Sequence, residues 1–391
     1  MNFFQIGGDI WTNLLWLLIL LIFFNFYPKI MVSQLLWRLE KSVSMLENLT
    51  SQAKKIVLKK ISKKPERNLR ERVDNFLEFF AIEPVNLDPY GIVKKLEHIS
   101  NLSEEKFKMF VKNIASKFDK EAQANLVMGL NATILLHQLT KLVRHYVELV
   151  RKTKNLQLGM LLEMQMPVIE KMSKALLNGV EALTNGWPIG DSIGPMVAAR
   201  LIGSGKVKEI GGDVVIAERK IKGKRVWIIK AKGPGGRLGK LGRVVEKLVK
   251  EKKIKKIITI DAALKLEGEK TGKVAEGVGV AIGGIGVDRA FIEEIATKKK
   301  IPLDSIVIKM SQEEAIQPLT EEILKSIPVV MEVVERNVEN SKGRILVVGV
   351  GNTCGVGNDE KAAREAEILA KKNLKILKKK KEEEKKSWDW F

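Results

Sequence analysis

The sequence predicts an α+β protein with one N-terminal transmembrane helix, a helical middle region, and a C-terminal three-layer α/β domain with a mostly parallel sheet. An uncharged apolar run near the N-terminus predicts the first part, and apolar residues at helical spacing predict the second. From Gly186 onward, glycine becomes frequent and short β-rich runs alternate with helical stretches, as in an α/β domain. The predicted parts are a membrane anchor at 1–28, a basic juxtamembrane helix at 29–65, a helical domain at 66–185, an α/β hydrolase-like domain at 186–358 and a Lys/Glu-rich helical tail at 359–391.

The composition and charge limit the class of protein and its partners. Hydrophobic residues make up 45% and charged residues 29% of 391 residues, which fits a folded protein of two or three structural units. The formal net charge of +21 favours anionic partners: lipid headgroups, nucleic acid or an acidic or phosphorylated ligand. Nucleic acid fits less well, because few aromatic residues lie between the lysines for base stacking. The single cysteine, Cys354, excludes an internal disulfide and favours a reducing compartment.

The predicted membrane anchor is the run IWTNLLWLLILLIFFNFY at residues 10–27, which carries no charge. As a helix it would be roughly 27 Å long, which is close to the thickness of a bilayer core. A cleaved signal peptide is the alternative, but the sequence has no basic residue before the run and no small-residue cleavage site after it. We therefore expect a single-pass membrane protein.

The distribution of basic residues predicts the orientation of this anchor. Residues 1–9 contain no lysine or arginine, whereas residues 29–72 contain twelve of them and four glutamates. The positive-inside rule then places the N-terminus outside the cell membrane and the C-terminal body in the cytoplasm. The juxtamembrane helix is basic and amphipathic, so it is expected to attract anionic headgroups, with a solvated helix or a helix–helix contact as the alternative.

The α/β domain is predicted from five helical stretches and several short strands. A Lys222–Gly223 turn joins the first two strands, and Ser311 and Glu314 have the spacing of a capping box. Residues 84–91 are expected to be a turn-rich connection, and the terminal residues WDWF could return to the membrane interface. The predicted strands are 214–216, 226–229, 257–260, 278–282, 306–308 and 345–350, and the predicted helices are 193–203, 241–252, 288–298, 312–325 and 328–338.

Two aspartates are the candidate catalytic residues. Asp191 lies in GWPIGDSIGP at the entry to a helix, and Asp261 ends the apolar strand IITID. Ligands of α/β proteins bind at the carboxyl ends of the strands, where two carboxylates could share a proton, activate water or hold a divalent metal. The alternative is that Asp191 only caps a helix and Asp261 only forms a hydrogen bond with a loop.

Two glycine-rich loops are candidate ligand-binding elements. In KGPGGRLGK, backbone N–H groups beside basic side chains could hold a phosphate or an acidic peptide, but an ordinary tight turn is the favoured alternative. In GVGNTCG, a dinucleotide site is disfavoured because the required acidic residue would fall in the Lys/Glu tail. The candidate residues are Lys232, Gly233, Gly235, Gly236, Arg237, Gly351 and Asn352.

Residues 186–315 resemble the spore germination protease and the hydrogenase maturation proteases. The resemblance is carried by the GD-x-x-GP element at Asp191 and by the run from IITIDAAL through GIGVDR to the Ile-Pro before a strand. It implies a phosphorylase/hydrolase-like fold in which Asp191 and Asp261 match the two functional carboxylates. No histidine follows His145, so the histidine that completes the metal site of the hydrogenase maturation proteases has no counterpart.

The opening strand of these proteases, of the form V-G-x-G-N, is missing before Asp191, and a matching ILVVGVGN occurs at residues 345–352. A circularly permuted sheet would explain both facts. The whole chain also resembles an uncharacterised archaeal family of membrane-anchored proteins that share the GDSIGP, KGPGG and GVGNT elements. The expected function is a membrane-anchored, cytoplasm-facing, peptidase-like hydrolase. The alternative is a non-catalytic membrane scaffold that binds an anionic ligand or a protein partner.

Overall fold

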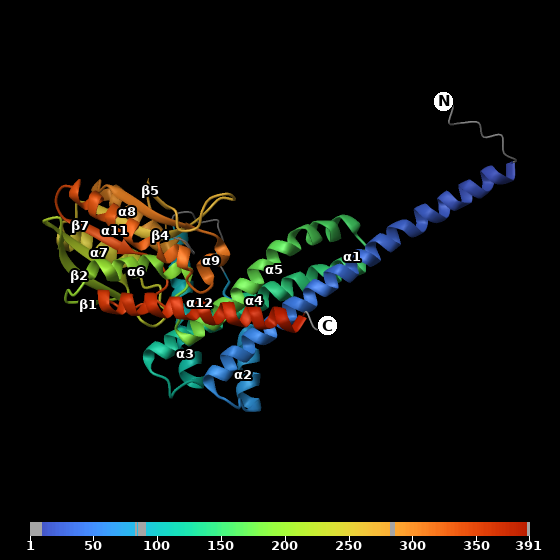
Figure 1. Cartoon of the computed structure of the whole chain (residues 1–391), viewed down its shortest axis with the longest axis horizontal. Coiled ribbons are helices and arrows are strands. Elements are labelled where there is room, and N and C mark those ends of the chain that lie inside the picture. The colour runs from blue at the N-terminus through green and yellow to red at the C-terminus, as the bar shows by residue number, and fades with distance from the viewer. Residues whose placement is uncertain (1–9, 83, 85–90, 282–285, 389–391) are drawn as a thin grey trace, which may run out of the picture. The chain divides into compact units, whose positions relative to one another are not determined.

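The computed structural model describes residues 10–82, 84, 91–281 and 286–388 (Figure 1). The chain divides into two compact units, Met1–Ser51 with Leu136–Ser173 and Gln52–Leu135 with Lys174–Phe391. Most of the predicted connection at 84–91, and the last three residues of the terminal WDWF, lie outside the described residues.

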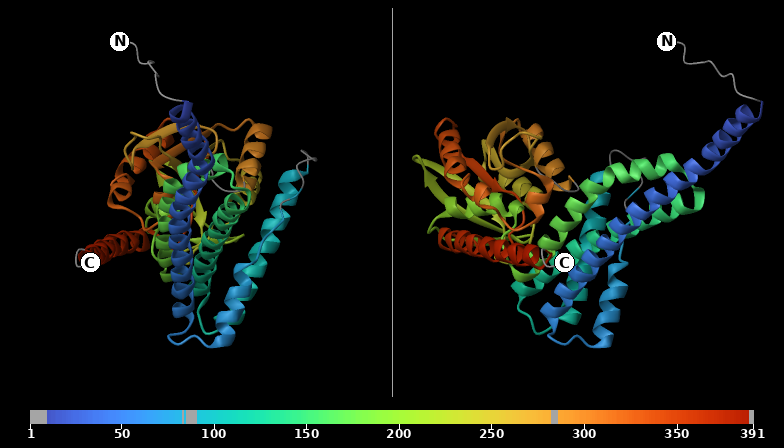
Figure 2. Two further views of the ribbon diagram at one scale, coloured as in Figure 1. Left: turned by 90° about the vertical axis from the view of Figure 1, so that its right-hand side faces the viewer. Right: turned by 45° about the vertical axis from the view of Figure 1, so that its right-hand side comes forward.

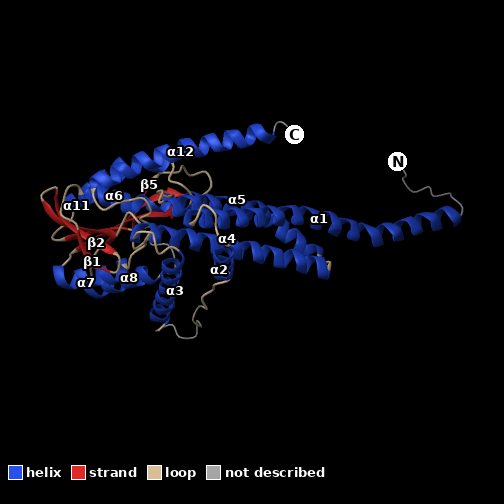
Figure 3. Ribbon diagram, turned by 90° about the horizontal axis from the view of Figure 1, so that it is seen from below, coloured by secondary structure: helices blue, strands red, loops and turns tan. Residues whose placement is uncertain are grey.

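The first helix, α1, runs without a break from Ile10 to Ile61, where the sequence predicted an anchor and a separate juxtamembrane helix (Figure 3). Its residues from Leu14 to Phe24 are exposed, and the side chains that follow at helical spacing are buried in the first unit. These buried side chains are Val32, Leu35, Leu39, Val43, Leu46 and Leu49.

Two helices are long and apolar enough to cross a membrane by length and composition. They are Leu14–Ile61 and Lys120–Thr153, whose most apolar windows are 6% and 56% buried, respectively. Core helices and signal sequences can also meet this criterion, so it supports a membrane span in α1 only weakly. The burial of the second helix is that of a core helix.

The rest of the first unit is a helical hairpin formed by the end of α4 (Lys120–Thr153) and the start of α5 (Leu156–Asn185). The hairpin lies alongside α1 (Figure 2). Ion pairs connect the two, including Arg144 with Glu40 at 2.6 Å and Arg151 with Glu40 at 2.7 Å.

The helical part of the second unit includes α2 (Arg67–Leu77) and α3 (Ile92–Ile114). Phe76 of α2 stacks on Phe110 of α3 with ring centroids 3.8 Å apart, and Phe107 meets Phe76 edge-to-face. Aromatic pairs of this kind add to the stability gained from burial alone, so the two helices form a small aromatic core.

The C-terminal domain contains a seven-stranded mixed sheet in the order β1-β2-β3-β7-β4-β6-β5. The four central strands are parallel, and the strands at both edges are antiparallel to their neighbours. The strands are β1 (Lys208–Gly211), β2 (Val214–Ile221), β3 (Lys224–Ala231), β4 (Lys256–Leu264), β5 (Val274–Val278), β6 (Leu303–Met310) and β7 (Ile345–Gly349). A parallel centre requires crossover helices, and the sequence between the strands supplies them.

Helices cover both faces of this sheet, which gives the predicted three layers (Figure 3). On one face, α6 (Ile193–Ile202), α11 (Ile327–Glu339) and α12 (Glu360–Trp388) pack on a core that includes Ile258 and Ile260 of β4. On the other face, α7 (Leu241–Lys252) and α8 (Val287–Lys299) pack on a core that includes Ile257. Alternate residues of a strand point to opposite faces, so this assignment also fixes the face of their neighbours.

In the C-terminal domain, two predicted elements differ from the structure and one strand was not predicted. The strand expected at 278–282 lies earlier, at β5, and residues 282–285 are outside the described range. The helix expected at 312–325 is two short helices, α9 (Gln312–Ile316) and α10 (Glu321–Leu324), because Pro318 between them forms a β-bridge with Ile189. Strand β1 was not predicted. The capping box of Ser311 and Glu314 at the start of α9 is confirmed.

Candidate functional site

Three glycine-rich loops meet beyond the carboxyl ends of β3 and β7. They are residues 186–191 before α6, residues 232–239 after β3 and residues 350–358 after β7. The N–H of Gly355 donates to the carbonyl oxygen of Pro234 at 2.8 Å, and a Cβ on Gly355 would lie 2.6 Å from the carbonyl oxygen of Gly186. We call this meeting point the loop junction. It contains every candidate residue from the sequence except Asp261.

Asp191 holds two of these loops together. Its Oδ2 accepts a hydrogen bond from the N–H of Asn352 at 2.7 Å, and a Cβ on Gly351 would lie 2.0 Å from the Asp191 carbonyl oxygen. Burial raises the pKa of Asp191, and the hydrogen bond from Asn352 opposes that rise. The residue as a whole is half-buried. Asp191 therefore acts as a structural tie and could still gain or lose a proton.

Asp261 lies near the carboxyl end of β4 and is only 2% exposed. Its Oδ1 accepts a hydrogen bond from the N–H of Ala262 at 2.7 Å. Strand alternation directs Asp261 to the same face as Ile257, which is the face covered by α7 and α8. Asp191 instead begins the turn that leads into α6, on the other face.

The backbones around the two aspartates nevertheless come close. A Cβ on Gly194 would lie 2.1 Å from the carbonyl oxygen of Val350 and 2.5 Å from that of Ile260, the residue before Asp261. Glycine at 194 thus lets α6 begin directly against the ends of β4 and β7. Both aspartates belong to the carboxyl edge of the sheet, one from each side.

A divalent metal would need more ligands than this pair. Among the described residues, no group of three or more His, Cys, Asp and Glu side chains could hold a metal ion. Protein metal sites normally draw on several such ligands, with water completing the shell.

The backbone N–H groups of the KGPGG loop already have acceptors within the protein. The N–H of Gly235 donates to Oε2 of Glu121, and that of Gly236 donates to Oδ1 of Asn125, both at 2.7 Å. The N–H of Gly233 donates to Oδ1 of Asn358 at 2.8 Å. Two consecutive N–H groups at a tight turn can form a binding site for an anion, but here one is occupied by the carboxylate of Glu121 and the other by the amide oxygen of Asn125.

The basic side chains of this loop are also paired. Arg237 forms an ion pair with Glu121 at 2.5 Å, and Lys232 forms one with Glu209 at 2.7 Å. Burial raises the pKa of Glu121, but hydrogen bonds from Arg237 and Gly235 outweigh this and hold that pKa below its usual value. Glu121 therefore stays ionised and neutralises the loop.

Asn352 and Cys354 complete the junction from the β7 side. Oδ1 of Asn352 accepts the N–H of Cys354 at 2.8 Å, and the Cys354 thiol donates to Oδ1 of Asn125 at 3.5 Å. Cys354 is fully buried, and burial raises the pKa of its thiol. A nucleophilic cysteine needs an accessible thiolate, so Cys354 is a packing residue.

Lys230 is a buried charged residue that sequence reasoning missed. It ends the apolar run of β3 and is completely buried. Its Nζ donates to the carbonyl oxygens of Ala231 and Gly357 at 2.9 Å and to Oδ1 of Asn358 at 3.0 Å. Burial lowers its pKa to about 7, although three acceptors suit an ammonium group. A lysine within VWIIKA was the only sign of this in the sequence.

Glu121, Asn125, Thr353 and Asn358 are further residues of the junction that the sequence analysis did not identify as candidates. Glu121 and Asn125 are one helical turn apart on α4, more than 100 positions before the loop that they contact. Nothing in their local sequence indicates that contact.

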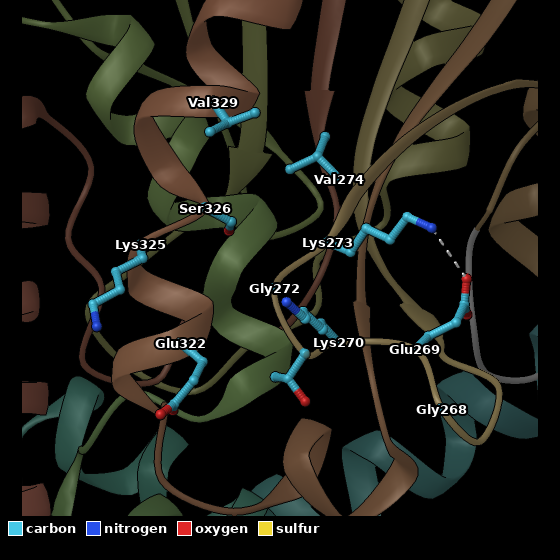
Figure 4. A pocket seen from close by; sticks show the side chains of 11 residues that line it. Gly268, Glu269, Lys270, Gly272, Lys273, Val274, Glu322, Lys325, Ser326 and Val329 are labelled. Carbon is cyan, nitrogen blue, oxygen red and sulfur yellow. Dashed lines mark ion pairs between the residues drawn. The ribbon is translucent and has the colours of Figure 1, made fainter.

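A second region of the carboxyl edge is an open pocket of about 730 Å³. One wall is the loop Gly268–Val274, which joins β4 to β5, and the other is formed by Glu322, Lys325, Ser326 and Val329 (Figure 4). The pocket presents three lysines, at positions 270, 273 and 325, and two glutamates. Lys273 lies 3.8 Å from Glu269, while Glu322 and Lys325 extend from the opposite wall. All three lysines are exposed, although Lys325 also lies 4.0 Å from Glu321, so the lining carries a small excess of positive charge at the edge of the sheet where ligands of α/β proteins bind.

Two family models match the chain. The model described as "Protein of unknown function (DUF1512) N-terminal domain" matches residues 13–186, and "Domain of unknown function (DUF1512) C-terminal" matches residues 189–357. The chain belongs to the DUF1512 family. In this DUF1512 protein the loop junction combines both matched regions, because Glu121 and Asn125 come from the first and the loops after β3 and β7 come from the second. No curated protein matches the chain.

Proposed function

We propose that this DUF1512 protein is a single-pass membrane scaffold whose basic body faces the cytoplasm and binds an anionic ligand or partner without turning it over. The observation that carries this proposal is the closed network of the loop junction. Backbone N–H groups of the loop after β3 donate to side chains of Asn358, Glu121, Asn125 and Thr353. The guanidinium of Arg237 is paired with Glu121. A catalytic site needs groups that are free to meet a substrate.

The membrane anchor is supported by the exposure of α1. From Leu14 to Phe24 the helix carries only apolar side chains, and each is exposed. Exposed apolar surface costs roughly 25 cal/mol per Å² in water, whereas a helix with a continuous apolar surface is stable in a bilayer. The positive charge after residue 28 then favours a cytoplasmic body.

Flotation and protease protection test the anchor and its orientation. The full-length protein should float with membranes after alkaline carbonate treatment, and a variant with Leu17→Lys and Leu20→Lys should not. In sealed membranes from producing cells, the C-terminal body should be digested only from the cytoplasmic side. Recovery of the native protein in the soluble fraction would exclude the anchor.

The pocket in Figure 4 is the proposed binding site for the anion. An acidic oligo-glutamate peptide, titrated against the full-length protein in detergent, should bind with a strong salt dependence. Lys270→Glu with Lys325→Glu should abolish binding, whereas Asp191→Asn with Asp261→Asn should leave it unchanged. Equal binding by all three proteins would exclude the pocket.

A peptidase-like hydrolase is a second candidate, and two observations favour it. The raised pKa of Asp191 at a carboxyl edge, with Asp261 close by in the backbone, is typical of residues that exchange protons. The parallel pairing of β7 with β4 is also the neighbour relationship that a permuted protease-like sheet requires. Asp191→Asn should then abolish peptide hydrolysis while the thermal midpoint stays within a few degrees of the native value. Hydrolysis that continues in both single aspartate variants would exclude this candidate.

A further inference from the structure

The hairpin of the first compact unit has a defined register against α1. In α4, Thr140 forms a hydrogen bond with Thr50 at 2.9 Å, and Arg151, later in α4, reaches back to Glu40 at 2.7 Å. From the first of these contacts to the second, the residue number increases along α4 and decreases along α1, so the two helices are antiparallel. The end of α4 therefore lies toward the apolar part of α1.

The start of α5 returns along α1 in the opposite sense. A Cβ on Gly159 would lie 2.4 Å from Cδ2 of Leu35, and Oε1 of Glu170, further along α5, accepts a hydrogen bond from Ser42 at 2.7 Å. Helix α5 is thus parallel to α1. The turn at Asn155 precedes Gly159 by one helical turn, and it lies at the level of residue 31 of α1.

This register gives the depth of the turn relative to a bilayer. The apolar run of α1 ends at Tyr27. Residue 31 is one helical turn further on, or roughly 6 Å along the helix axis. The interfacial zone on each side of the hydrocarbon core is about 5–7 Å thick. If α1 crosses the bilayer, the turn lies at the level of the headgroups.

The side chains of the turn match such a surface. Lys152 and Lys154 are exposed, and Lys29 of α1 is exposed at a similar depth. No acidic residue occurs between Glu148 and Glu163. Clustered lysines next to a membrane-spanning helix bind anionic headgroups, each lysine contributing about a fivefold change in affinity.

We propose that the α4–α5 turn, residues 151–158, docks on the anionic headgroup layer next to α1 and forms a second membrane contact. This inference rests on the proposed anchor. The membrane would then hold the first compact unit at two points, α1 and the turn, and so fix its tilt. With α1 as the single contact, the unit could change its tilt relative to the membrane.

Depth-dependent quenching tests the contact on the full-length protein. Gln157→Cys is labelled with an environment-sensitive fluorophore, and Lys41→Cys serves as the control on the same unit, about 20 Å beyond the apolar run. Native Cys354 is fully buried and remains unlabelled. Vesicles of phosphatidylcholine, with and without phosphatidylserine, carry headgroup spin labels.

The label at position 157 should be quenched in phosphatidylserine vesicles, and the label at 41 should not. Lys152→Glu with Lys154→Glu should shift the docking equilibrium at least twentyfold toward the undocked state, whereas Lys41→Glu should leave it unchanged. A protein that floats with vesicles while label 157 stays unquenched overturns this inference and leaves the anchor intact. Equal quenching without phosphatidylserine overturns the role of anionic lipid. A protein that does not float overturns both proposals.

Discussion

The loop junction and the open pocket lie at the same edge of one sheet and both contain glycines and basic side chains, yet the two regions differ in how tightly most of their chain is packed. At the junction, a Cβ on Gly233 would lie 1.8 Å from the carbonyl oxygen of Val356. At the pocket, a Cβ on Gly272 would lie 2.5 Å from the carbonyl oxygen of Glu322, but one on Gly268 would meet nothing within 4 Å. Gly233 is required for close approach of two backbones, whereas Gly268, with φ of +87°, serves the turn alone.

The basic side chains of the two regions also differ in their burial. At the junction, Arg237 is largely buried against Glu121, whereas Lys270 and Lys325 of the pocket extend into solvent. A glycine-rich, basic loop can thus bind an acidic group of its own chain or one from outside. The difference separates a structural joint from the proposed binding site.

The largest loss of stability is expected at a glycine whose Cβ, if added, would collide with neighbouring backbone. Gly355→Ala should reduce the free energy of unfolding by about 4 kcal/mol, because a left-handed backbone and a collision with Gly186 and Pro188 add together. Gly223→Ala is the matched control: its φ of +75° is close to the +70° of Gly355, but nothing lies within 4 Å. It should lose about 1 kcal/mol in chemical denaturation. Equal losses would mean that the junction adjusts without cost.

An intermediate effect on the free energy of unfolding is expected from the buried Lys230, and this effect depends on pH. Its pKa in the folded state is lowered to about 7, so above pH 7 the unfolded chain binds more protons than the folded one. The free energy of unfolding should therefore rise with pH, by at most about 1.4 kcal/mol per pH unit, between pH 7 and the usual lysine pKa near 10.4.

Lys230→Met should lack this rise, and comparing the two denaturation profiles from pH 7 to 9 isolates the lysine. Parallel profiles would show that the three oxygen acceptors keep the ammonium charged throughout this range. In that case the junction would hold a permanent buried cation.

The smallest effect on stability is expected in the pocket. Lys270→Glu with Lys325→Glu should change the free energy of unfolding by no more than about 0.5 kcal/mol, since both side chains are exposed. Thermal unfolding of the variant checks this. A loss as large as that of Gly355→Ala would show that the pocket lysines support the fold, and the contrast between the two regions would disappear.

Local patterns in the sequence predicted much of the fold. The capping box at Ser311, the turn at Lys222–Gly223 and the apolar strand before Asp261 depend on residues a few positions apart. Strand β5 was placed too late because VAEGV has little of the β-rich character of the central strands, and it lies at the sheet edge where such character is less needed.

The candidate site was harder to predict because its partners are distant in sequence. KGPGG was recognised as a possible anion site, but the anion itself, Glu121, lies on a helix assigned to another domain. The side of the sheet to which Asp261 points depends on which helices cover each face, and a strand sequence alone does not contain that information. Glycine frequency reveals that backbones come close, without revealing which ones.

The buried thiol of Cys354 can report whether the three loops of the junction stay together. Its sulfur lies among Asn125, Ala182 and Leu183, out of reach of solvent. A thiol reagent can modify it only while the loops separate, so the rate of modification measures how often they part. Because the sequence contains no other thiol, a single mass shift would follow that opening in the unaltered protein.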